Sequence, residues 1–158
     1  MENTSLARYL NANRILLLNR VSSKKQVFEL LGELLTESLE NIQPSQASTA
    51  LIARERLGTT ALGEGVAIPH CRIDGIDEIR SAVIKLEHAV NFDAPDGQDV
   101  SFFYALLVPI NATNEHLATL GRLAEFLSDQ GNRDQLASCD TSEELLSTFT
   151  KTSDKHAA

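Results

Sequence analysis

Apolar residues in the first third of the chain change from a continuous run to a helical period. Residues 14–19 (Arg-Ile-Leu-Leu-Leu-Asn) contain an uninterrupted apolar run, which predicts a short buried strand. Apolar residues then recur at steps of three and four, and Ser23 with Gln26 forms a capping signal, so a helix is expected from Ser23 to about residue 40. A second helix is predicted over residues 44–57, because it would begin at a proline and a glycine follows it.

The middle of the chain has the pattern of strands and tight turns. Residues 58–65 contain three glycines and two threonines, which is typical of a loop whose amides approach a ligand closely, and residues 66–68 predict a strand. Apolar segments at 82–86 and 102–108 predict two further strands. Because the second of these is apolar on both faces, we expect it at the centre of the sheet. Turn-forming residues at 93–97 connect the two strands.

Helical spacing returns in the last third of the chain. It predicts one helix that ends near residue 131 and a final capped helix over residues 141–150, where a threonine is followed three positions later by a glutamate. Helices at both ends with strands between them predict an α/β fold, a mixed sheet with helices on both faces. We expect a single domain over residues 1–151 and a flexible tail over residues 152–158.

Composition narrows the function classes. The 22 acidic and 14 basic side chains give a net charge of -8, which argues against a nucleic-acid-binding surface. Apolar runs are too short for a bilayer span, so no membrane insertion is expected. Cys71 and Cys139 lack the spacing of paired metal ligands, and no amino-terminal signal segment appears, so we expect a reducing cytoplasm and no metal. No cofactor is expected, and Cys71 is interpreted as a packing residue. Lys24 and Lys25 are interpreted as a solvated helix end.

His70 is the strongest candidate for chemistry. It follows the segment Gly-Glu-Gly-Val-Ala-Ile-Pro at positions 63–69, in which the proline fixes its own φ and restricts the residue before it. An imidazole can act near neutral pH as a nucleophile, a base or a ligand, whereas the competing interpretation is a buried ring bonded to the backbone. Upstream, Arg54, Arg56 and a pair of threonines supply cations and donors of the kind that stabilise phosphoryl oxygens.

These residues belong to a longer pattern. The segment 54–70, Arg-Glu-Arg-Leu-Gly-Thr-Thr-Ala-Leu-Gly-Glu-Gly-Val-Ala-Ile-Pro-His, resembles the active-site signature of the enzyme IIA domains of the bacterial phosphoenolpyruvate-dependent sugar phosphotransferase system, of the fructose, mannitol and nitrogen-regulatory type. Residues 105–109 (Ala-Leu-Leu-Val-Pro), followed by Glu115-His116-Leu117, resemble the strand, turn and helix start that carry a second histidine in that family. The likeness covers nearly the whole chain.

The resemblance implies a phosphoryl carrier in which Nε2 of His70 attacks the phosphohistidine of the small carrier HPr or of its nitrogen-branch paralogue. The other ring nitrogen then needs an acceptor that fixes the tautomer, and the sequence does not identify it. Arg54, sixteen positions before His70 as in the family, is assigned to the phosphoryl oxygens. Arg56 faces another side of the helix and is interpreted as a surface residue.

Further site residues follow from the same resemblance. His116 is expected to hydrogen bond to the phosphoryl group or to position His70, and the competing interpretation is a surface histidine at a helix start. Thr60 and the backbone amides around Gly63 and Gly65 are expected to complete the phosphoryl cradle.

The expected partners are an HPr-type phosphocarrier and regulated target proteins such as kinases or potassium transport systems, which bind the phosphorylated and unphosphorylated forms differently. A free-standing nitrogen-regulatory IIA protein is the preferred interpretation. Within the family, the alternative is a fructose- or mannitol-type IIA protein that passes phosphate to a IIB domain. Outside it, the alternatives are a binding module without phosphate traffic and a metal-dependent hydrolase using His70 and His116, which lacks a close set of carboxylate ligands.

Overall fold

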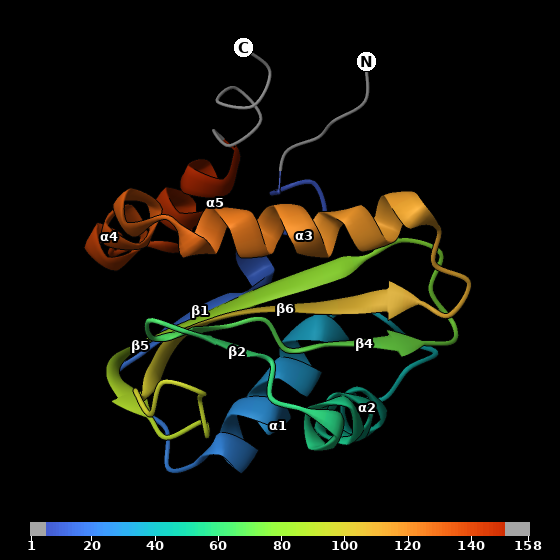
Figure 1. Cartoon of the computed structure of the whole chain (residues 1–158). Helices are drawn as coiled ribbons and strands as arrows, with labels where there is room; N and C mark the ends of the chain where they lie inside the picture. The colour runs from blue at the N-terminus through green and yellow to red at the C-terminus, as the bar shows by residue number, and fades with distance from the viewer. Residues whose placement is uncertain (1–5, 151–158) are drawn as a thin grey trace.

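The computed structural model describes residues 6–150 as helices packed on a central sheet (Figure 1). The elements in chain order are a 3-10 turn at Ala12–Arg14, β1 (Ile15–Leu18), α1 (Lys24–Leu35), α2 (Pro44–Leu57), β2 (Ala61–Gly63), β3 (Val66–Ala67), β4 (His70–Ile73), β5 (Arg80–Val90), β6 (Val100–Pro109), α3 (Asn114–Ser128), α4 (Gln130–Ser138) and α5 (Ser142–Thr150). The tail predicted over residues 152–158 lies outside the described residues.

Six strands form one mixed sheet in the order β1-β5-β6-β3-β2, and β4 also pairs with β6. β1 runs parallel to β5, β5 runs antiparallel to β6, and both β3 and β4 run parallel to β6. β6 therefore has neighbours along both of its edges. The prediction that residues 102–108 form a central strand is confirmed.

Side chains of β6 alternate between two cores, because successive residues of a strand point to opposite faces of the sheet. One core lies between the sheet and helices α3 and α5, and the other lies between the sheet and helices α1 and α2 (Figure 1). The first contains Phe102, Tyr104, Leu106 and Val108, and the second contains Phe103, Ala105 and Leu107. The predicted mixed sheet with helices on both faces is thus confirmed. Within residues 6–150, no helix combines the length and apolarity that a membrane crossing requires.

The predicted helix boundaries agree at α2 and α5 and differ at α1 and α3. α1 begins after its cap Ser23, as predicted, but ends at Leu35, where Thr36 hydrogen bonds back to the carbonyl of Gly32. α3 ends at Ser128, because Asp129 has an extended backbone and its carboxylate accepts the amide of Asn132. That cap starts α4, a separate helix that the sequence pattern missed.

The glycine-rich segment is a hairpin rather than the predicted open loop. β2 and β3 pair antiparallel around a turn at Glu64 and Gly65, both of which have positive φ. The strand predicted at 66–68 ends at Ala67, and β4 begins at His70. β3 and β4 both pair in parallel with β6, so Pro69 lies between two strand segments on the same side of β6. The carbonyl of Pro69 still accepts the backbone N–H of Leu106.

Close approach of α1 and α2 fixes the position of α2, which carries Arg54. A Cβ atom added at Gly32 would lie 2.5 Å from the carbonyl oxygen of Pro44 and 3.0 Å from Cβ of Ser48. Backbone oxygen cannot move away as a flexible side chain can. Glycine at position 32 is therefore a packing requirement of the helix pair.

Replacing this glycine tests the packing. Gly32→Ala is expected to lower the free energy of unfolding by about 1–3 kcal/mol, because overpacking outweighs the better helix propensity of alanine. Gly121→Ala in α3 is the matched control, since an added Cβ meets nothing within 4 Å there, and it should raise stability by about 0.5–1 kcal/mol. Urea denaturation measures both changes, and equal effects of the two substitutions would contradict this account.

Candidate functional site

His70 opens β4 opposite Leu106 of the central strand and is half-buried. Its ring lines a groove of about 430 Å³ between α2, β4 and α3. The other side chains around this groove include Arg54 and Leu57 of α2, Arg72 of β4, and Leu117 and Leu120 of α3. The structure thus brings together two of the predicted site residues, His70 and Arg54.

A backbone carbonyl fixes the orientation and tautomer of the His70 ring. Nδ1 lies 2.7 Å from the carbonyl oxygen of Ile68. A carbonyl only accepts hydrogen bonds, so Nδ1 carries the proton and donates it. In the neutral ring, Nε2 then carries the lone pair. The acceptor that the sequence could not identify is the carbonyl two residues before the histidine.

The surroundings of His70 favour the neutral ring. Burial lowers its pKa below the ordinary value of 6.5, and the positive charge of Arg54 lowers it further. The hydrogen bond to Ile68 and the negative charge of Glu55 act in the opposite direction but do not outweigh these effects. A neutral imidazole with a free lone pair is therefore the main form at pH 7.

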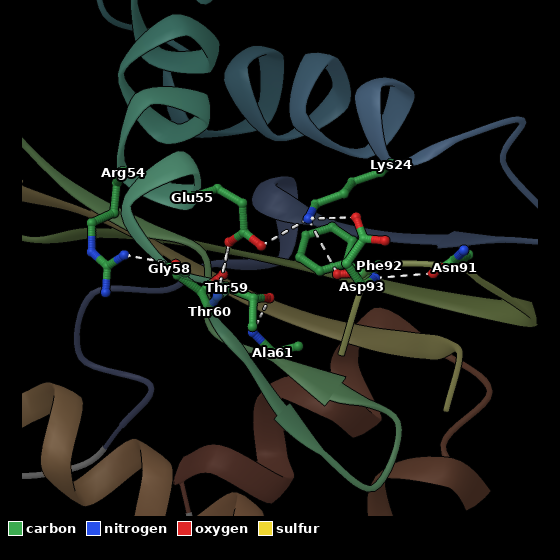
Figure 2. Close-up of polar contacts among 10 residues, drawn as sticks. All are labelled: Lys24, Arg54, Glu55, Gly58, Thr59, Thr60, Ala61, Asn91, Phe92 and Asp93. Carbon is green, nitrogen blue, oxygen red and sulfur yellow. Dashed lines mark hydrogen bonds and ion pairs between the residues drawn. The ribbon is translucent and has the colours of Figure 1, made fainter. Parts of the chain in front are cut away.

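Arg54 lies in the last turn of α2 and is half-buried. One of its guanidinium nitrogens donates to the carbonyl of Gly58 over 2.9 Å, which holds the planar group beside the end of its own helix (Figure 2). The remaining N–H groups of the fork are donors suited to a phosphoryl group. Arg56 is exposed, as predicted.

Arg72 is a candidate that the sequence interpretation missed. It lies two residues after His70 on β4, so both side chains project from the same face of the strand. It lines the same groove, and its guanidinium donates to the carbonyl of Ile110 over 3.3 Å. The period of two in a strand is the signal that could have identified it, but β4 itself was not predicted.

The structure places the predicted cradle residues away from the groove. Thr60 is buried, and both its hydroxyl and its amide donate to the carboxylate of Glu55, over 2.6 and 2.8 Å. Gly63 and Gly65 belong to the β2–β3 turn and line other pockets, where Asp96 lies beside Gly63. Their positive φ angles serve the hairpin, so the assignment of these residues to a phosphoryl cradle has no geometric support.

His116 lies at the start of α3, where Nδ1 accepts the backbone N–H of Thr113 over 3.1 Å. It therefore acts as part of a helix cap, as in the competing interpretation. The pocket that it lines contains Asp74 and Asn111 and is distinct from the groove of His70. Its assistance to His70 stays a prediction.

An ion pair beside Arg54, with a buried carboxylate and a half-buried ammonium group, was also missed. Glu55 follows Arg54 on α2, and its Oε2 lies 2.9 Å from Nζ of Lys24 at the start of α1 (Figure 2). The same ammonium lies over the ring of Phe92 and 3.4 Å from the carboxylate of Asp93. The interpretation of Lys24 as a solvated helix end is wrong. Its partners are far away along the chain, so no local pattern indicates the pair.

The thiol next to His70 is part of the core. Cys71 is buried, and burial raises the pKa of its thiol to about 12, which confirms a packing residue. Across residues 6–150, no three His, Cys, Asp or Glu side chains gather as metal ligands would.

Comparison with known proteins defines the class. The family model described as "Phosphoenolpyruvate-dependent sugar phosphotransferase system, EIIA 2" matches residues 8–152. The chain belongs to this EIIA family, as its sequence resemblance predicted.

Among its relatives, the "Nitrogen regulatory protein" of Pseudomonas aeruginosa is 43% identical over 123 residues, which cover 78% of this chain and 80% of that protein. The crystal structure of the nitrogen regulatory protein IIA-Ntr from Neisseria meningitidis matches with a TM-score of 0.85 and 41% identity, covering 91% of this chain and 98% of that one. IIA mannitol from Escherichia coli shares the fold, with a TM-score of 0.71 and 23% identity over 89% of this chain and 98% of that one.

The electrostatics of the site can be tested by titration. We expect the His70 imidazole to titrate below pH 6.5, because burial and Arg54 both disfavour the protonated ring. Arg54→Ala should raise this midpoint, since a neighbouring positive charge is removed, whereas Arg56→Ala removes an exposed one and should leave it unchanged. NMR titration of the ring measures all three proteins. A midpoint at or above 6.5 in the parent chain would contradict the assignment.

Proposed function

We propose that the protein is a phosphoryl carrier in which Nε2 of His70 accepts a phosphoryl group from the phosphohistidine of HPr or of its nitrogen-branch paralogue. The observation that carries the proposal is the 2.7 Å contact between Nδ1 of His70 and the carbonyl of Ile68, which leaves the lone pair on Nε2, in a residue that lines the same groove as Arg54. This is the arrangement that a nucleophilic imidazole requires.

The transfer needs positioning and charge stabilisation more than a strong base. The Nε2 lone pair attacks phosphorus, the P–N bond to the carrier's imidazole breaks, and its electron pair returns to the carrier ring. Nδ1 of His70 keeps its proton throughout, and the carbonyl of Ile68 stabilises the positive charge that develops on the ring. Arg54 and Arg72 supply guanidinium donors from two sides of the groove for the equatorial oxygens.

Docking of a carrier protein needs an apolar surface around the nucleophile, and the groove has one. Leu57 and Leu117, which line it, are 85% and 38% exposed. Large exposed apolar side chains gathered around a reactive group are typical of a protein-binding site. Leu57 and Leu117, the apolar rim, are the proposed contact with the phosphocarrier.

Regulation of partners by the phosphorylation state is the proposed output. The phosphoryl group adds roughly two negative charges within this apolar rim, so a partner that packs on the rim distinguishes the two forms. The names of two relatives support the nitrogen-regulatory branch. Kinases or potassium transport systems are the proposed class of target. Passage of phosphate to a IIB domain is the alternative. Both activities belong in the cytoplasm, where the buried thiols of Cys71 and Cys139 stay reduced.

Phosphorylation on His70 is the direct test. Incubation with phosphoenolpyruvate, enzyme I and the carrier is expected to add one acid-labile phosphate to the chain and none to His70→Ala. Intact-protein mass spectrometry before and after acid treatment measures it, with His88→Ala as the control, since His88 is exposed and lies at the end of β5. An undiminished signal in His70→Ala would refute the proposal. Efficient onward transfer to a sugar-specific IIB domain would instead favour the alternative.

Removal of the guanidinium tests the role of Arg54. Arg54→Ala should slow phosphoryl gain by about 100-fold, because a positioned cation no longer stabilises the transferring group, while the fold is retained. Arg54→Lys restores the charge without the planar fork and should recover only part of the rate. Stopped-time phosphorylation assays measure the rates. A rate close to that of the parent chain in Arg54→Ala would remove Arg54 from the mechanism.

A further inference from the structure

We propose that Glu55 is a positioning residue for the phosphoryl-accepting site: its buried carboxylate fixes the turn at residues 58–60, whose carbonyls hold Arg54 directly and His70 through Ile68. The inference rests on the proposed function and adds a residue that never touches the phosphoryl group. It also gives a role to the Lys24–Glu55 ion pair, which the phosphoryl chemistry itself leaves unused.

Glu55 determines the conformation of the turn that follows α2. Its Oε1 accepts two hydrogen bonds from one residue, the backbone N–H of Thr60 over 2.8 Å and the hydroxyl of Thr60 over 2.6 Å (Figure 2). Two donors on one carboxylate oxygen fix both the main chain and the side chain of Thr60. Hydrogen bonds to a charged acceptor are the strong ones, and this pair is buried.

Two hydrogen bonds connect the turn to the nucleophile. The carbonyl of Thr60 accepts the backbone N–H of Ile68 over 3.0 Å. The carbonyl of the same Ile68 accepts Nδ1–H of His70 over 2.7 Å. A displacement of Thr60 therefore moves the peptide whose oxygen selects the tautomer of His70. Since Pro69 restricts the residue before it, Ile68 has little freedom to adjust by itself.

A third hydrogen bond connects the same turn to the guanidinium of Arg54. Gly58, two residues before Thr60 in the same turn, accepts the hydrogen bond of Arg54 over 2.9 Å. The turn thus presents two carbonyls, that of Gly58 to the guanidinium of Arg54 and that of Thr60 to the backbone N–H of Ile68. Since Glu55 fixes this turn through Thr60, it connects the nucleophile to its cation.

Lys24 makes the burial of this carboxylate possible. Burial alone raises the pKa of Glu55, but the bonds from Thr60 and the Lys24 ammonium outweigh it, and the pKa is lowered. The ammonium also donates to the carbonyl of Phe92 over 3.2 Å, so the charge pair joins α1, α2 and the β5–β6 connection. The carboxylate is consequently ionised and held at neutral pH.

The tautomer of His70 gives a direct test in the free protein. Two-bond 1H–15N correlation spectra of the imidazoles should place the proton on Nδ1 of His70 in the parent chain. In Glu55→Ala both acceptor bonds to Thr60 are lost, so a mixture with the Nε2–H tautomer is expected, with phosphoryl gain about tenfold slower. Glu55→Gln retains an acceptor oxygen for Thr60 and should keep the Nδ1–H form and most of the rate. Equal spectra and rates in Glu55→Ala and the parent chain would overturn the inference.

A second pair of variants, at Thr60, tests the inference if Glu55→Ala does not fold. Amide spectra would reveal such a loss of folding. Thr60→Val removes the hydroxyl donor at nearly constant shape, whereas Thr60→Ser keeps it, so only the valine variant should shift the tautomer. Identical tautomers in these two variants would also overturn the inference. The tautomer is read without any carrier. A parent chain with Nδ1–H that gains no phosphate would therefore refute the proposed function and leave the positioning role of Glu55 standing.

Discussion

The contact between Nδ1 of His70 and the carbonyl of Ile68 is the interaction on which the rest of the site depends. A histidine ring has two nitrogens of similar basicity, and only the one without a proton can act as a nucleophile. By binding Nδ1–H to an oxygen that cannot donate, the protein leaves the lone pair on Nε2. Burial then lowers the pKa, so the lone pair is not lost to protonation at neutral pH. Neither effect alone would give a ready nucleophile.

This contact exists because of how β4 joins the sheet. β3 and β4 both pair with the central strand β6, and the interruption at Ile68 and Pro69 turns a carbonyl away from the ladder and toward the ring that follows. β6 has apolar side chains packed on both faces, so it is a rigid reference for the histidine beside it. Helix α2 is held to α1 by the tight approach at Gly32 and carries Arg54 to the same groove. The site therefore lies where helix α2 meets the sheet at β4.

Sequence reasoning succeeded where the physical signal is local. Helical periods and capping residues located α1, α2, α3 and α5, and the doubly apolar run located β6, because these signals lie within a few turns of chain. It missed α4, which buries only Asn132 and Leu136 and so has almost no apolar stripe. It interpreted the β2–β3 hairpin as a ligand-binding loop, because glycines serve tight turns and phosphate contacts equally well.

In the site too, only the features with a local sequence signal could be predicted. His70 and Arg54 could be proposed together because their spacing lies within one resembling segment. The acceptor for Nδ1 could not, because a backbone carbonyl leaves no mark in the sequence. Nor could the pairing of Lys24 with Glu55, since the two residues come from different helices and meet only after α1 and α2 pack. In each case the missing information is a tertiary contact.

Charge distribution around the groove bears on the proposed regulatory role. The chain carries a net charge of -8, yet Arg54 and Arg72 line the groove, so the site is locally basic on an acidic protein. At physiological salt the Debye length is about 8 Å, so the distant acidic residues are largely screened from a phosphoryl group in the groove, while the two guanidinium groups are not. Phosphorylation in the proposed mechanism therefore largely cancels the positive potential of these two groups, and it does so mainly within the apolar rim. A partner that reads the phosphorylation state must contact that rim directly, because elsewhere on the surface the two forms present nearly the same field.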